Sequence, residues 1–365
     1  MTERYDVAVI GAGMAGASIA AELAPHARVL LVEAEDQPGY HTTGRSAAFW
    51  EVCYGGPEVV PLTLASGPYL RELGALHTRG ALYVARDQDE AAVAAFRERF
   101  DGTGANLRMV GRAELEQRVA GLRPEWTHAI EEPSCADIDV AALHQHYLAL
   151  GRRGGVVLRS STRLEAAERE GDGWRLRFAR GEEALAGVLV NAAGAWADDV
   201  AALAGVRKLG IAPLRRTVVQ MRTDPPSPVD LPLVLDIGGA FYFKPEQDRL
   251  WLSPHDETPS APCDAAPEEL DVALAIHRFE QVVDWRVTAV ERKWAGLRNF
   301  APDRLPVYGY DPRVEGFFWF AGQGGFGIQT APAAARLGAQ LLLGQERDGM
   351  TQALEPALYS PARFG

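Results

Sequence analysis

The first forty residues constrain the fold most strongly, because a short apolar run leads directly into a glycine-rich turn. Residues 6–10 have the pattern of a buried parallel strand. The turn at residues 11–16 reads GAGMAG, and the small residues that follow, up to Leu23, predict a helix. A second buried strand over residues 28–33 ends in Glu33. This order is a complete βαβ unit, and it predicts a doubly wound α/β domain.

Each glycine of this turn has its own role in a nucleotide-binding loop. Gly11 permits the tight turn, Gly13 lets the backbone approach a pyrophosphate, and Gly16 lets the helix pack closely on the sheet. The helix N-terminus offers unpaired N–H groups to phosphates. Glu33 stands where ribose hydroxyls need an acceptor, and its charge disfavours a 2′-phosphate. The motif predicts a dinucleotide other than NADP and does not separate FAD from NAD.

Three later segments favour FAD. The small-residue stretch 39–48 can lie along an extended cofactor, with Arg45 near a phosphate and Ser46 hydrogen-bonded to the flavin. Residues 191–196 follow a buried strand, where doubly wound sheets bind ligands. Residues 322–329 form another glycine-rich turn that opens a helix, and a helix N-terminus stabilises the negative charge of a reduced flavin. Three small-residue or glycine-bearing segments of this kind can together contact a long cofactor such as FAD.

Length and composition exclude several classes of protein. A chain of 365 residues predicts two domains. A formal net charge of −12 without a basic patch argues against a nucleic-acid partner. The N-terminus has no secretory signal pattern, and no apolar run approaches the roughly 20 residues of a membrane span. We therefore expect no transmembrane segment and a cytoplasmic protein, with peripheral attachment to the inner membrane left open.

The sequence predicts no metal site. Its three cysteines, Cys53, Cys135 and Cys263, are far apart and form no CxxC pair. His144 and His146 are two apart on a predicted helix, so their side chains point to different faces.

The order GxGxxG, HTTGRSAA, VNAAGAW, WAGLR and AGQGGFGIQT resembles the D-amino-acid oxidase and glycine oxidase superfamily of flavoenzymes, in particular the bacterial D-arginine dehydrogenases. The similarity runs nearly end to end. It implies an FAD-binding Rossmann-like domain of the glutathione-reductase type and a substrate domain built on a mostly antiparallel sheet. It also implies hydride transfer from the substrate Cα to flavin N5, giving an imino acid that water hydrolyses to a 2-oxo acid and ammonia.

The resemblance implies domain boundaries and a set of cofactor contacts. We expect residues 1–79, 139–210 and 296–365 to form the FAD-binding domain, and residues 80–138 and 211–295 to form the substrate-binding domain. The residues predicted to contact FAD are Gly11, Gly13, Met14, Ala15, Gly16, Glu33, Ala34, Thr42, Thr43, Arg45, Ser46, Ala47, Ala48, Ala193, Gly194, Trp196, Gly296, Arg298, Gly324, Gly325, Phe326, Gly327, Ile328, Gln329 and Thr330.

The positions that match the family's motifs also predict which residues form the substrate pocket. The predicted carboxylate partners are Arg215, Tyr242 and Arg298, with the adjacent Arg216 as the alternative to Arg215. A planar guanidinium binds a carboxylate bidentately and a phenol adds an orienting hydrogen bond, so the Cα–H can be aimed at N5. The other predicted pocket residues are Tyr54, Gln329, Phe49 and Gly325, whose carbonyl is expected to accept from the substrate amino group.

Two departures from the D-arginine dehydrogenases bear on the substrate. Phe49 stands in a segment where they carry a histidine, and Ala81 stands where they carry the glutamate that binds the basic side chain. A buried cation without a partner costs on the order of several kcal/mol. We therefore expect an apolar or aromatic side chain, with Phe49, Trp50 and Ala81 lining its pocket. Glu51 is the alternative anion.

The cofactor attachment and the electron acceptor are less constrained. No cysteine lies near Arg298, so the FAD is expected to be noncovalent. Trp251 aligns with a lysine that speeds oxygen reaction in sarcosine oxidases, which favours a dehydrogenase, but a quinone, an electron carrier and oxygen all stay open as acceptors. The alternatives are a secondary-amine oxidase for sarcosine-like or proline-like substrates, a flavoprotein subunit of an electron-transfer complex, and a nucleotide-binding module without catalysis.

Overall fold

The computed structural model describes residues 2–365 and contains two large sheets and a small one. Eight strands form the first sheet, in the order β10-β11-β12-β1-β2-β9, with β20 beside β12 and β19 beside β20. They are β1 (Glu3–Ile10), β2 (Val29–Val32), β9 (Val157–Arg159), β10 (Leu164–Glu170), β11 (Gly173–Phe178), β12 (Glu183–Asn191), β19 (Val307–Tyr310) and β20 (Phe317–Ala321).

The first sheet has a parallel centre, as the apolar strand sequences predict. Strands β20, β12, β1, β2 and β9 run parallel, and β10 and β11 form an antiparallel ribbon at one edge. Helices α1 (Met14–Leu23), α5 (Val140–Arg153) and α8 (Ala331–Leu343) pack together, and α1 and α8 share one core with strands β1 and β20. The ribbon and α6 (Ala197–Leu203) share a second core with the sheet.

The second sheet is mostly antiparallel and has the order β21-β18-β13-β16-β15-β14-β5-β7-β6, with β17 paired to β13. Only the β14–β5 pairing is parallel among the described strands of this sheet. The strands are β5 (Ala81–Arg86), β6 (Arg108–Gly111), β7 (Trp126–Glu132), β13 (Ala212–Asp224), β14 (Leu233–Asp236), β15 (Tyr242–Glu246), β16 (Arg249–Ser253), β17 (Thr258–Pro259), β18 (Arg286–Phe300) and β21 (Gln323–Gly324).

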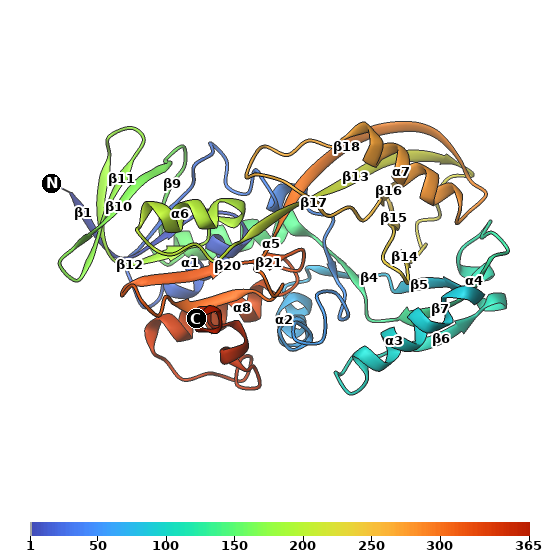
Figure 1. Ribbon diagram of the computed structural model, residues 1–365, viewed down its shortest axis with the longest axis horizontal. Helices are drawn as coiled ribbons and strands as arrows, with labels where there is room; N and C mark the ends of the chain where they lie inside the picture. Colours follow the sequence, from blue (N-terminus) through green and yellow to red (C-terminus); the bar gives the residue numbers. More distant parts are fainter. Residues whose placement is uncertain (1) are drawn as a thin grey trace.

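The remaining elements fill the space around these sheets. A three-stranded sheet has the order β3-β8-β4. Its strands are β3 (Phe49–Trp50), β4 (Leu76–Thr78) and β8 (Ala136–Ile138), and the other helices are α2 (Val60–Glu72), α3 (Glu90–Phe100), α4 (Arg112–Arg118) and α7 (Glu269–Glu280). In Figure 1 the first sheet lies on the left and the second on the right, and the long strands β13 and β18 run from the centre into the right-hand part.

These features confirm the predicted fold class, a Rossmann-like sheet combined with a mostly antiparallel one. Asp139 is the N-cap of α5, because its side chain accepts a hydrogen bond from the Ala142 amide at 2.9 Å. Strand β18 crosses the predicted boundary at residue 296, and the boundaries themselves remain predictions. Within residues 2–365, no helix is long and apolar enough to cross a membrane.

Candidate active site

A cavity of about 740 Å³ takes its walls from both large sheets. One part of the wall is the predicted nucleotide loop with the ends of β1, β2 and β12, and another is the face of β13, β15 and β18. Ligand pockets usually enclose about 300–1,000 Å³, so the cavity is large enough for an extended ligand. The predicted cofactor residues on its wall are Gly11, Gly13, Met14, Ala15, Glu33, Ala34, Thr42, Thr43, Arg45, Ser46, Ala47, Ala48, Ala193, Gly194, Trp196, Gly296, Arg298, Gly324, Gly325, Phe326, Gly327 and Ile328.

The glycines of the first turn are required by close backbone approaches. Gly11 has φ +98°, and a Cβ on it would lie 2.6 Å from the carbonyl oxygen of Ala192. A Cβ on Gly16 would lie 1.8 Å from the Gly11 carbonyl oxygen, so Gly16 packs the helix under the turn and does not reach the cavity. The ring of His144 supports the turn from outside, with Nε2 2.9 Å from the Ala12 carbonyl oxygen.

The carboxylate of Glu33 is fixed at the end of β2. Its two oxygens accept hydrogen bonds from the amides of Ala12 at 2.9 Å and Glu35 at 3.0 Å, and the residue lines the cavity. The hydroxyl of Thr43 accepts from the Met14 amide at 2.9 Å, which ties the 41–48 segment to the first turn of α1. The end of β1, the start of α1 and the carboxylate of Glu33 therefore lie together, as the βαβ pattern predicts.

Besides Gly16, two predicted cofactor residues do not line the cavity. Gln329 and Thr330 lie behind the wall, where the Gln329 amide donates to the carbonyl of Glu51 and to the hydroxyl of Thr63. Arg45 lines the cavity, but its guanidinium binds the carboxylate of Asp264 and the carbonyl of Ala265. These bonds direct the guanidinium of Arg45 toward the loop after β17.

The arginines predicted to bind a carboxylate lie on β13 and β18. Arg216 pairs in register with Gly296, and Leu214 with Arg298, so Arg216 and Arg298 point to the same face of the sheet. Arg298 Nη1 donates to the hydroxyl of Tyr54 at 2.8 Å. Arg216, Arg298, Tyr54 and Tyr242 all line the cavity, and both guanidinium groups are at most 9% exposed.

Arg215 lies on the opposite face, which corrects the prediction that it contacts substrate. Its guanidinium binds the carboxylates of Glu268 and Asp271, the latter at 3.0 Å, and it does not line the cavity. Side chains alternate along a strand, so two adjacent arginines cannot face the same cavity. Arg216 takes the place predicted for Arg215.

The field around this site favours an anion. Burial, followed by the charge of Arg298, lowers the pKa of Arg216 to about 10. Burial, followed by the charges of Arg216 and Arg298, lowers the pKa of His255 to about 3, so this cavity residue is neutral. The Nε of Arg298 is buried without a hydrogen-bond partner in the described structure. Two adjacent buried cations are stabilised by a carboxylate.

Glu257 partly supplies that charge. Its carboxylate accepts from Arg298 Nη2 at 2.6 Å and lies 3.8 Å from Arg216 Nη2, and it also accepts from the exposed Arg304. Sequence reasoning missed Glu257, His255 and Arg304. The first two lie on the loop between β16 and β17, and their place in the cavity depends on how that loop folds back, for which the sequence carries no periodic signal.

The predicted side-chain pocket is corrected in part. Phe49 lines the cavity, and its ring centroid is 5.9 Å from that of Tyr242. Trp50 and Ala81 are buried outside the cavity, Trp50 with its indole N–H donating to the Thr63 carbonyl at 3.0 Å. Gly325 lines the cavity, and a Cβ there would lie 1.8 Å from the Tyr54 hydroxyl.

Trp251 also lies outside the cavity, which removes the support it gave to a dehydrogenase. Its ring centroid is 5.1 Å from that of Trp294, and Lys244 Nζ is 5.0 Å from it.

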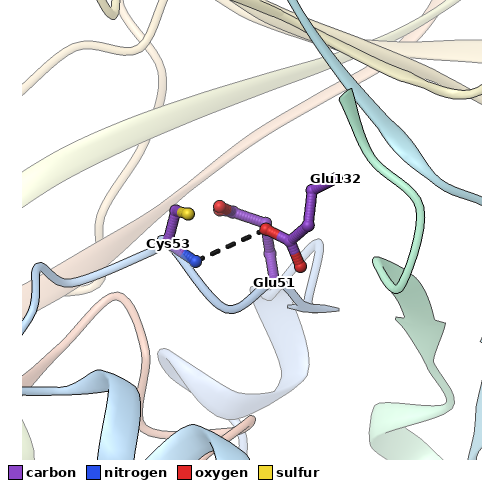
Figure 2. Close-up of side chains that lie close together, drawn as sticks. All are labelled: Glu51, Cys53 and Glu132. Atoms are coloured by element: carbon purple, nitrogen blue, oxygen red, sulfur yellow. Dashed lines mark hydrogen bonds between the residues drawn. The ribbon is translucent and has the colours of Figure 1, made fainter. Parts of the chain in front are cut away.

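A buried acidic cluster forms another part of the wall. Figure 2 shows Glu51 and Glu132 facing one another beside Cys53, and their nearest polar atoms all lie within 4.8 Å. Glu132 accepts hydrogen bonds from the amides of Val52 at 2.9 Å and Cys53 at 3.4 Å. Neither carboxyl forms a salt bridge within residues 2–365, and the sequence did not indicate that they meet.

The comparisons with known proteins agree with this architecture. Residues 6–341 match the FAD dependent oxidoreductase (DAO) family, and the chain belongs to that family. A glycine oxidase from Pseudomonas aeruginosa is 26% identical, over 99% of both chains. FAD-dependent oxidoreductase domain-containing protein 1 of Bos taurus is 25% identical, over all of this chain and 86% of its own length.

Solved structures show the same fold. A glycine oxidase from Geobacillus kaustophilus superposes with a TM-score of 0.85 at 25% identity, over 98% of both chains. An L-proline dehydrogenase from P. horikoshii superposes with a TM-score of 0.86 at 22% identity, over 100% of this chain and 98% of its own, a likeness that concerns the fold alone.

The residues present fit FAD, the cofactor of this family. Gly11 and Gly13 present backbone without a side chain to the cavity, the first turn of α1 opens on the cavity, and Glu33 lies where a ribose would be bound. The cavity wall also includes Arg216 and Arg298, whose two cationic side chains suit an anion.

Proposed function

We propose that this chain catalyses the FAD-dependent oxidative deamination of a D-amino acid with an apolar or aromatic side chain. The observation that carries the proposal is the convergence of two buried arginines, Arg216 and Arg298, with two tyrosines in the cavity that fits FAD. A charge-assisted, multidentate site of this kind suits an α-carboxylate. When bound, FAD supplies the hydride acceptor.

The protein's own residues would orient the substrate. A carboxylate held by Arg216, Arg298 and the phenol of Tyr242, with the hydroxyl of Tyr54 beside Arg298, would fix the position of Cα, and such positioning contributes several kcal/mol to reactions of this type. The carbonyl of Gly325 is proposed to accept from the amino group. The ring of Phe49 offers apolar contact to the side chain. The D configuration and the noncovalent attachment of FAD are taken from the resemblance, and release of the flavin by acid precipitation tests the attachment.

Relatives support the class of substrate. Glycine oxidases from two bacteria align with nearly the whole chain, and solved structures with the same fold include an L-proline dehydrogenase and an iminodiacetate oxidase. These substrates all carry an amino group and a carboxylate. A secondary-amine oxidase is therefore the competing candidate, and it would keep the same arginine pair.

The test is anaerobic mixing of the FAD-loaded protein with D- and L-amino acids, sarcosine and proline, because bleaching of the flavin absorbance requires no assumed acceptor. We expect bleaching by apolar and aromatic D-amino acids. Bleaching by sarcosine or proline alone would assign the chain to secondary amines. No bleaching by any of these compounds would reject the proposal and point to an electron-transfer subunit or another substrate.

A further inference from the structure

The cavity has an aromatic end whose wall includes the carboxyl of Glu51. Tyr83, Phe96 and Phe100 line this end, and the ring centroids of Phe96 lie 4.6 Å from Tyr83 and 5.0 Å from Phe100. Glu51 also lines it and is 4% exposed. Glu51 is three residues before Tyr54 on the same segment, so the carboxyl and the predicted carboxylate site belong to one continuous wall.

The hydrogen bonds of Glu51 determine what its carboxyl can offer a ligand. The phenol of Tyr83 donates to Glu51 Oε1. Burial, followed by the charge of Glu132, raises the pKa of Glu51 well above its usual range, and a carboxyl oxygen of each residue lies within 4.8 Å of the other. Glu132 is the better anion, because it accepts from two backbone amides and from the Ser134 hydroxyl at 3.1 Å. These contacts are best satisfied by a proton on Glu51 that is directed toward Glu132.

Because this proton is directed toward Glu132, Glu51 can only accept hydrogen bonds from a ligand in the cavity. A ligand group beside it must therefore be a hydrogen-bond donor, and the surrounding rings favour an aromatic group that carries it. A cationic group is disfavoured, because a protonated Glu51 supplies no counter-charge and Arg99, which also lines the cavity and forms no salt bridge within residues 2–365, adds a positive charge.

We propose that Glu51 is a specificity-determining residue that accepts a hydrogen bond from a donor at the edge of an aromatic substrate side chain, a phenol or an indole. This inference rests on the proposed function and narrows its substrate class. A purely apolar pocket would not distinguish a phenol from an isosteric methylated ring. An anionic pocket would instead select a basic side chain.

The experiment compares kcat/KM for D-tyrosine with that for D-4-methylphenylalanine, which has the same shape and no donor. One neutral hydrogen bond in a buried site predicts a ratio on the order of ten in the wild type. Glu51→Gln should keep the ratio, because its amide accepts from Tyr83 and donates to Glu132 as the neutral acid does. Glu51→Met, which cannot accept, should bring the ratio close to one.

Flavin content measured for each variant separates loss of fold from loss of selectivity. A wild-type ratio near one, or a ratio that Glu51→Met leaves unchanged, would overturn the inference while the proposed function stands. Faster turnover of D-arginine or D-lysine than of D-tyrosine would also overturn it and would make the two carboxyls a counter-charge. Failure of every D-amino acid to reduce the flavin would instead reject the proposed function, and this inference with it.

Discussion

Arg298 is hydrogen-bonded to Glu257 through Nη2 at 2.6 Å, on the same guanidinium whose Nη1 donates to Tyr54. Glu257 thus holds a carboxylate against the group proposed to bind the substrate carboxylate. We predict that Glu257→Gln lowers KM for the amino acid several-fold, because it removes a competing anion from Arg298 and Arg216. Glu291→Gln is the control, since Glu291 pairs with Arg222 and Arg249 outside the cavity. A raised KM would mean that Glu257 instead positions Arg298.

The pH dependence of kcat/KM should have two limbs. The substrate ammonium must lose a proton before hydride transfer, so we predict a rise with pH. His255 does not contribute to that limb, because burial keeps its pKa at about 3 and the ring is neutral. Above about pH 10, kcat/KM should fall as Arg216 loses its proton. A substrate with a more acidic amine should shift only the rising limb. A profile without a rise would contradict the requirement for a neutral amine.

Binding of FAD should depend on Glu33. Glu33→Ala removes the acceptor for the Ala12 and Glu35 amides and the group proposed to bind the ribose. Hydrogen bonds to a charged group contribute about 1.5–3 kcal/mol each, so the dissociation constant of FAD should rise at least about tenfold. Asp36→Ala is the matched control, because Asp36 is exposed and does not line the cavity. Equal affinities in the two variants would contradict the assigned ribose site.

Glu51 should also affect stability in a pH-dependent manner. Its pKa is raised in the folded state, so its contribution to stability is complete below the unfolded pKa near 4.5 and is lost as pH rises toward the folded pKa. Glu51→Gln cannot ionise. We therefore predict that the melting temperature of the variant minus that of the wild type increases with pH above about 4.5. A difference that is constant with pH would show that Glu51 is not buried as an acid.

The sequence predicts the fold well where local pattern and tertiary environment agree. Strands β1, β2, β12 and β20 are apolar on both faces, because helices or the β10–β11 ribbon cover both sides of their sheet. A run of consecutive apolar residues of this kind predicts a buried strand. The first half of β18 has no such signal, because most of residues 286–293 are exposed. Its strand conformation comes from pairing with β13 along nearly its full length.

The site was harder to predict because orientation depends on register. The choice between Arg215 and Arg216 requires the pairing of β13 with β18, which local sequence does not contain. The family motif predicts Gln329 as a pocket residue. In the structure its side-chain amide lies behind the cavity wall and donates hydrogen bonds to the carbonyls of Glu51 and Tyr54. The meeting of Glu51 with Glu132 joins segments 81 residues apart and is likewise a property of the tertiary structure.

The central claim, that Arg216 and Arg298 hold the substrate carboxylate, is tested most directly by the anaerobic flavin-reduction rate of two neighbouring variants. Arg216→Lys and Arg215→Lys both keep the positive charge, and only the first removes a bidentate donor from the cavity. We predict that Arg216→Lys lowers the second-order rate constant for flavin reduction by a D-amino acid about 100-fold, while Arg215→Lys stays within about threefold of wild type. Equal losses, or a larger loss in Arg215→Lys, would contradict the account.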